Sequence, residues 1–148
     1  MKVRVAAAFK QAGNVLCLKY TYGGKDVFSL PGGGADNDIP LQEVVAKEWR
    51  EELGVKVDIG DIILIGEAPT GDLYPRTLHI IFEARGILGI PKIQADATCA
   101  LEVTWVPVRK LAHLPLYPDV GKQLHAVFTE EPRRSLAFVS NCMERGYW

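Results

Sequence analysis

The chain has 148 residues, of which 48% are hydrophobic and 24% are charged, and its formal net charge is −1. This size and composition are typical of one globular domain with a substantial core, so we expect a single domain over residues 1–148. The near-neutral charge gives no electrostatic reason to expect nucleic acid or a membrane as a partner, and no apolar run is long enough to span a membrane.

Cysteine usage points to a reducing compartment. Cys17, Cys99 and Cys142 are odd in number and lack paired spacing, which excludes a zinc finger and argues against a disulfide framework. At the N-terminus, Lys10 interrupts the apolar run of MKVRVAAAF before it reaches the length of a signal peptide. The expected location is cytoplasmic.

The first third of the chain predicts strands followed by a helix. Residues 2–9 and 14–20 alternate around the turn sequence QAGN and predict an opening β-hairpin. A short strand over 26–30 leads into a glycine-rich loop. A helix follows between Pro40, which suits a first helical turn, and Gly54, which suits a left-handed stop.

The rest of the chain predicts more strands than helices. We expect strands over 55–68, with a bend or bulge at Gly60-Asp61, and over 77–85, 101–108 and 135–140. Helices are expected over 108–114 and 118–128, and loops over 69–76 and 86–97. Because strands dominate and the long helix lies between strands, we predict an α+β fold with helices on both sides of a mixed sheet.

The helix after Pro40 has an unusual face. Its first half carries an apolar stripe, which consists of Leu41, Val44 and Val45. At roughly 100° per residue, Glu48, Glu51 and Glu52 continue that stripe two turns later. Glutamates at this spacing repel each other, whereas Mg²⁺ and Mn²⁺ prefer clustered carboxylate oxygens. On an arbitrary helix such a triplet is mostly a solvated surface, but the apolar stripe and the adjoining glycines favour a metal site.

These residues carry a family resemblance. The segment from Gly33 to Val55 resembles the Nudix box, which reads G, five residues, E, seven residues and REUxEExGU, where U is aliphatic. Gly33 takes the first position, and KEWREELGV, residues 47–55, takes the last block. Three positions depart from the pattern: Ile39 replaces a Glu, Lys47 replaces an Arg, and Trp49 replaces an aliphatic residue.

The resemblance implies an α/β/α sandwich with a mixed sheet between helices, and a hydrolase. Such proteins cleave the pyrophosphate of a nucleoside diphosphate derivative by attack of water on phosphorus, with Mg²⁺ or Mn²⁺ as cofactor. The implied ligands are the carboxylates of Glu48, Glu51 and Glu52, any of which could also accept a proton, and the carbonyl of Gly32. Lys47 keeps the charge of the family's bracing Arg but loses its planar fork.

Several further residues are candidates for the site. Family members recruit a later carboxylate as base or ligand, and Glu102 and Asp96 are the candidates here; each is equally well explained as a solvent-facing acid. Tyr74, Arg76 and His79 could contact phosphate or base, although such residues more often have no functional role.

The glycine-rich loop is a candidate for substrate binding. A strand, a glycine-rich loop and a helix in succession can bring backbone groups close to phosphate oxygens. On that basis Gly33 and Gly34 are candidates for contact with the substrate.

Two other functions and the choice of substrate stay open. Ile39 and Lys47 favour a catalytically weak, nucleotide-sensing relative, and a metal-buffering or purely structural acidic helix is disfavoured by the glycines. Nucleoside triphosphates, nucleotide sugars including ADP-ribose, and dinucleoside polyphosphates are weighted alike. Pro69 and Tyr74 lie near the family's loose markers for the latter two. The expected partner is a small nucleotide, and a homodimer, common in the family, also stays open.

Overall fold

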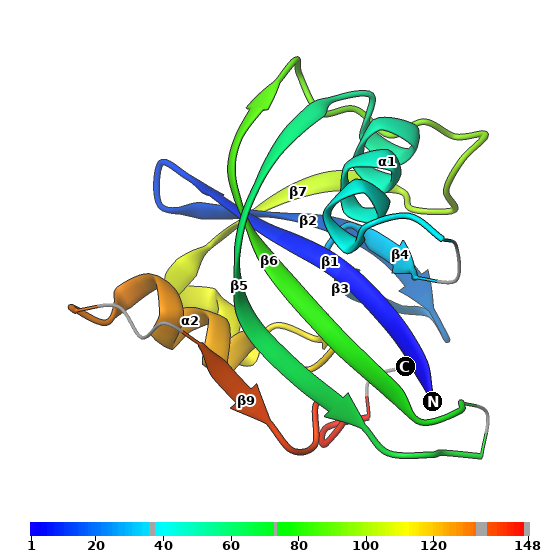
Figure 1. The fold of residues 1–148 in the computed structure, drawn as a ribbon, viewed down its shortest axis with the longest axis vertical. Helices are drawn as coiled ribbons and strands as arrows, with labels where there is room; N and C mark the ends of the chain where they lie inside the picture. The colour runs from blue at the N-terminus through cyan, green and yellow to red at the C-terminus, as the bar shows by residue number, and fades with distance from the viewer. Residues whose placement is uncertain (36–37, 73, 133–135, 147–148) are drawn as a thin grey trace.

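The computed structural model describes residues 1–35, 38–72, 74–132 and 136–146. Its centre is a curled, mixed sheet of nine strands, with α1 on one side and α2 on the other (Figure 1). The strands are β1 (Lys2–Gln11), β2 (Asn14–Tyr22), β3 (Lys25–Ser29), β4 (Gly32–Gly34), β5 (Lys56–Ala68), β6 (Thr77–Leu88), β7 (Glu102–Pro107), β8 (Leu116–Tyr117) and β9 (Ala137–Val139). The helices are α1 (Leu41–Leu53), the 3₁₀ helix η1 (Val108–His113) and α2 (Gly121–Thr129). The predicted α+β fold is confirmed.

The central strand of the sheet is β1. The strand order is β8-β3-β2-β1-β6-β5-β9, with β4 paired to β1 and β7 paired to β2. The predicted opening hairpin is confirmed, because β1 and β2 are antiparallel. On its other side β1 runs parallel to β6, which places Arg4 beside His79. This pairing joins segments that are far apart in the sequence.

The glycine-rich segment is partly a strand, which corrects the prediction of a loop. Residues 32–34 form β4, antiparallel to β1. A Cβ atom at Gly32 would lie 2.1 Å from the carbonyl oxygen of Val5, so only glycine permits this approach. Sequence patterns also missed β8, because two residues are too few to show a periodicity.

Boundaries account for the other differences. The stop signal of α1 is correct, because Gly54 is left-handed with φ 67°, while Pro40 stands at the N-cap, one residue before the predicted first turn. The shift in register between β5 and β6 near Gly60 confirms the predicted bulge, while β6 continues to Leu88 instead of ending at residue 85. The second helix starts at Gly121 and not at residue 118. The expected last strand is β9, and position 135, where it was predicted to begin, lies outside the described residues.

The sheet separates two apolar clusters. Beneath α1, the buried helix residues Val44, Val45, Trp49 and Leu53 pack with the β1 residues Val5, Ala7 and Phe9. Beneath α2 and η1, Ala6 and Ala8 of β1 pack with Ile81 and Leu124. Arg4 is therefore in phase with the second cluster, because side chains alternate along a strand. Among the described residues, no helix is long and apolar enough to cross a membrane.

Candidate active site

The candidate site forms where β4 meets α1. A Cβ atom at Gly33 would lie 2.6 Å from both Cδ and Oε1 of Glu48, so the absence of a side chain at this position makes room for the carboxylate. The indole of Trp49 is fully buried, and its Nε1 donates a hydrogen bond to the carbonyl of Pro31 at 3.2 Å. Trp49 therefore fixes the helix to the start of the glycine segment while keeping the apolar character of its position.

The three glutamates differ in their surroundings. Glu48 and Glu52 are half-buried, whereas Glu51 is exposed and forms an ion pair with Lys47 at 3.8 Å. The prediction that the stripe continues through the glutamates is wrong, because the buried residues of the second half of the helix are Trp49 and Leu53. The reason is that Trp49 and Leu53 extend the line of Val45 in steps of four residues, which leaves the glutamates at its border. We use the name carboxylate edge for the half-buried carboxylates of Glu48 and Glu52 together with Gly33, against which Glu48 lies.

Electrostatics within the carboxylate edge favour retention of a proton. Burial raises the pKa of Glu52 to about 8, with further contributions from the charge of Glu48 and a side-chain hydrogen bond to it. The positive charge of Arg4 acts in the opposite direction. Two carboxylates share this edge and one nearby guanidinium compensates them only in part, so the edge has capacity for a further cation.

Arg4 is a residue that sequence reasoning missed. Its Nη2 donates to the carbonyl of Leu30 at 3.1 Å, and its guanidinium lies 5.1 Å from the ring centroid of Tyr117. Its Nη1 is buried and has no hydrogen-bond partner in the described part of the chain. The available signal was its alternation with Ala6 and Ala8, which marks a charge on an otherwise apolar face of the strand.

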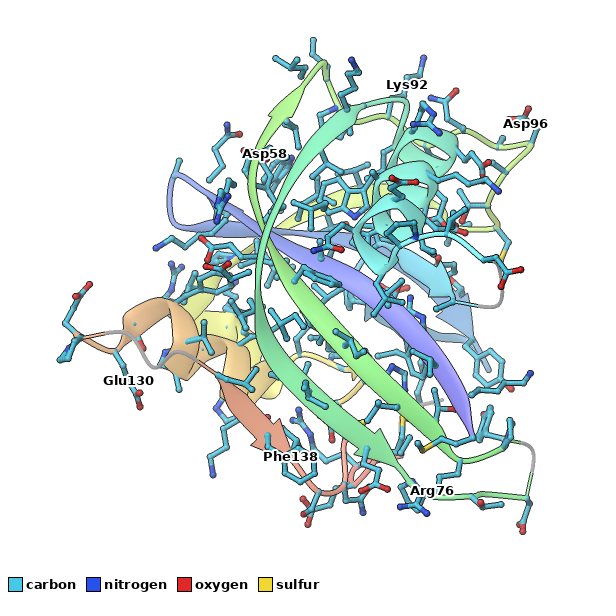
Figure 2. All side chains as sticks on the ribbon, in the orientation of Figure 1. Asp58, Arg76, Lys92, Asp96, Glu130 and Phe138 are labelled. Atoms are coloured by element: carbon cyan, nitrogen blue, oxygen red, sulfur yellow. The ribbon has the colours of Figure 1, made fainter. Side chains whose placement is uncertain are left out.

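The candidates after β5 divide into two groups. His79 is buried, with 1% of its surface exposed, and it lines a cavity together with Tyr74. Arg76 instead pairs with Glu67 on the neighbouring strand, at the opposite end of the molecule from α1 (Figure 2). The structure thus brings His79 and Tyr74 together at one cavity, and Arg76 does not line that cavity.

The two later carboxylates lie apart from the carboxylate edge. The carboxylate of Glu102, at the start of β7, lies 3.8 Å from Lys19 Nζ and accepts a hydrogen bond from Thr104 at 3.2 Å. Asp96 is exposed on the loop beside the end of α1 and points outward (Figure 2). That loop is held to the helix, because the backbone N–H of Gln94 donates to the carbonyl of Glu52 at 2.9 Å.

The donor groups present fit a hard divalent cation. Over residues 1–35, 38–72, 74–132 and 136–146, no three His, Cys, Asp or Glu side chains converge as a ready ligand set. The carboxylate edge nevertheless offers two adjoining carboxylates beside the backbone of β4, and Mg²⁺ and Mn²⁺ bind through such oxygen atoms. The partial compensation of these carboxylates by Arg4 is the observation that makes them suitable.

Comparison with solved structures shows the same fold. The E. coli ORF135 protein has a TM-score of 0.75 and 19% identity, over 90% of this chain and 95% of that one. A Bacillus halodurans MutT protein gives 0.69 and 18%, over 88% and 84%. An ADP-ribose pyrophosphatase from Streptococcus suis gives 0.66 and 22%, over 93% and 98%. No curated protein matches the chain significantly.

The sequence itself also matches a family model. The model describes the NUDIX domain, and the match extends over residues 1–127. It includes β4 and α1 and reaches into α2, so it covers far more of the chain than the box alone. The chain therefore belongs to the NUDIX domain family, a family of nucleotide pyrophosphohydrolases.

Proposed function

We propose that this protein hydrolyses the pyrophosphate linkage of a small nucleotide derivative with the help of Mg²⁺ or Mn²⁺. The observation that carries the proposal is the carboxylate edge, where Gly33 admits Glu48 beside a half-buried Glu52. Such an edge is destabilising for an empty helix surface and suits a bound cation. Family membership supports the same reaction.

Each residue of the box has a distinct role in this proposal. Glu48 and Glu52 would hold the cation, with the carbonyl of Gly32 as a backbone ligand and the exposed Glu51 at the outer side. A bound Mg²⁺ or Mn²⁺ supplies polarisation of phosphate oxygens and a more acidic water. A carboxylate that is free of the cation, at Glu51 or on a later loop at Asp96 or Glu102, accepts the proton from the attacking water.

The remaining box residues position this machinery. Lys47 braces Glu51 through one exposed ion pair, which is looser than a bidentate guanidinium contact. Backbone groups of Gly33 and Gly34 offer the phosphates a close approach. The related ADP-ribose pyrophosphatase and MutT structures support nucleotide derivatives as the substrate class. Nucleoside triphosphates, nucleotide sugars and dinucleoside polyphosphates all belong to it.

The test is hydrolysis of a panel of these nucleotides with Mg²⁺ or Mn²⁺. We expect turnover of one class, loss of activity with EDTA, and a decrease of about 10²–10⁴-fold for Glu52→Gln. Glu43→Gln is the matched control, because Glu43 lies exposed in the first turn of the same helix. If no nucleotide is hydrolysed but one still stabilises the protein against heat, the protein is a nucleotide sensor and the proposal is wrong.

A further inference from the structure

His79 is a buried polar residue whose hydrogen-bonding groups are unsatisfied within the described part of the chain. Only 1% of its surface is exposed, and neither Nδ1 nor Nε2 has a hydrogen-bond partner among the described residues. Burial, reinforced by the charge of Arg4, lowers its pKa to about 4, so the imidazole is neutral at physiological pH. A neutral imidazole offers one donor and one acceptor. Leaving both groups without a partner in the interior destabilises the free protein, and a ligand that hydrogen-bonds to them would remove this cost.

The cavity beside His79 has the size and character of a site for a flat ring. Its volume is about 220 Å³, below the roughly 300–1,000 Å³ of pockets that enclose a whole ligand of drug size. Its lining is largely apolar and aromatic, and includes Ala68, Pro69, Tyr74, His79, Tyr117 and Met143. Tyr117 meets the imidazole edge-on, with ring centroids 5.3 Å apart. We call this cavity the His79 pocket.

Arg4 connects the His79 pocket with the carboxylate edge. It is the register partner of His79 across β1 and β6, and its guanidinium lies over Tyr117, which lines the pocket. Its charge also interacts with the carboxylates of Glu52 and Glu48. The buried Nη1 has no partner in the described structure, and a phosphate oxygen would give it a charge-assisted hydrogen bond.

We propose that the His79 pocket binds the base of the nucleotide, that His79 hydrogen-bonds to the edge of the base, and that Arg4 contacts the adjoining phosphate. The inference rests on the proposed function for its ligand class. A neutral imidazole among apolar side chains suits an uncharged heteroaromatic ring better than a phosphate. The order of base, phosphate and cleaved pyrophosphate would then follow the line from His79 through Arg4 to the carboxylate edge.

The test is equilibrium binding in EDTA, which separates recognition of the base from hydrolysis. AMP, GMP, CMP and UMP are compared with ribose 5-phosphate, which has the phosphate but no base. We expect at least one nucleotide to bind at least tenfold more tightly than ribose 5-phosphate. This advantage should be lost in His79→Phe, which keeps the ring and removes both nitrogens. It should be reduced in Tyr74→Ala, which removes an exposed side chain and leaves the folded core intact.

Controls assign the effect to the pocket. His125→Gln changes a half-buried histidine on α2 and should leave the advantage of the base intact. In Arg4→Met, a nucleoside and its monophosphate should bind with similar affinity, because the phosphate contact is gone. Equal binding of ribose 5-phosphate and all nucleotides by the wild type would overturn the inference, as would an undiminished advantage in both pocket variants. Binding that depends on the base, without hydrolysis by the metal-loaded protein, would instead overturn the proposed function alone.

Discussion

The carboxylate edge and the His79 pocket hold polar groups in the interior in different ways. The carboxylate edge takes its acids from two successive turns of α1 and gathers charges of the same sign against Gly33. The His79 pocket takes its side chains from strands and loops distant in sequence and holds a neutral imidazole. The carboxylate edge lacks compensating positive charge, and His79 in the pocket lacks hydrogen-bond partners among the described residues. The difference indicates what each lacks: a cation in one, a polar but uncharged ring in the other.

Arg4 belongs to both regions. It compensates part of the negative charge at the carboxylate edge and lowers the pKa of His79 in the pocket. The guanidinium thus adds to the effect of burial in keeping the imidazole neutral, and it leaves the acidic edge short of positive charge. Experiments that disturb one region without the other can therefore test the division of labour.

The largest effect is expected at the carboxylate edge from Gly33→Ala. The new methyl group would lie 2.6 Å from Glu48 Oε1, so the carboxylate must move. Because a misplacement of about 1 Å can lower a rate by about 100-fold, we expect a loss of that size in nucleotide hydrolysis. Gly86→Ala is the control, since a Cβ atom there meets nothing within 4 Å. Full activity of Gly33→Ala would show that the position of Glu48 does not matter.

The second effect concerns the pH dependence of stability at the His79 pocket. The pKa of His79 falls from 6.5 to about 4 on folding. Its contribution to the free energy of unfolding is therefore complete above pH 6.5. It is lost as the pH decreases toward 4, because only the unfolded chain binds the proton. The loss amounts to about 3 kcal/mol over that range. Neither Arg4 nor Tyr117, which face the imidazole, titrates there: the guanidinium stays protonated in this range although burial lowers its pKa, and burial raises the pKa of Tyr117.

Urea unfolding of the wild type and His79→Phe between pH 7 and pH 4 measures this contribution. As the pH falls, the free energy of unfolding of the variant should rise relative to that of the wild type, because phenylalanine takes up no proton in the unfolded state. Parallel pH profiles for the two proteins would show that His79 is not held neutral by the fold.

A smaller effect is expected from the link between α1 and the glycine segment. Trp49→Phe keeps an aromatic ring but removes the 3.2 Å hydrogen bond from the indole to the carbonyl of Pro31, which then accepts only from the backbone N–H of Ala7. The loss of one buried hydrogen bond lowers the free energy of unfolding by about 0.5–1.5 kcal/mol, which urea denaturation can measure. Trp105→Phe, where the indole packs edge-on against Phe9, should change stability less. The opposite ranking would argue against a link through Trp49.

The smallest effect is expected at Lys47. Its ion pair with Glu51 is 3.8 Å long and about half exposed on both sides, so a double-mutant cycle with Lys47→Ala and Glu51→Ala should give a coupling of about 0.3–0.5 kcal/mol. High salt should reduce it. A coupling well above about 1 kcal/mol would mean that Lys47 braces the site as firmly as a guanidinium does.

The features that the sequence predicted correctly are mostly local. Pro40 and Gly54 mark the ends of α1 through their own backbone preferences. The spacing of Glu48 and Glu52 places them together on that helix whatever surrounds it. The alternating strands were also found with small errors at their ends, and the bulge near Gly60 was expected from its glycine.

The features that the sequence missed depend on contacts between distant segments. Residues 32–34 have no strand pattern of their own and become β4 only because β1 approaches closely enough to pair with them. The order of residues gives no indication that Arg4 and His79 are neighbours, since the parallel pairing of β1 and β6 sets that register.

By itself, the sequence determined the acidic helix, its caps and the chemistry that its carboxylates can support, because helix geometry fixes which residues share a face. Only the tertiary structure decided that Glu51 is exposed while Glu48 rests on Gly33, and that a neutral histidine lines a cavity beside a buried arginine. The physical reason is that burial, and with it each pKa and each unmet hydrogen bond, depends on which strands pack together.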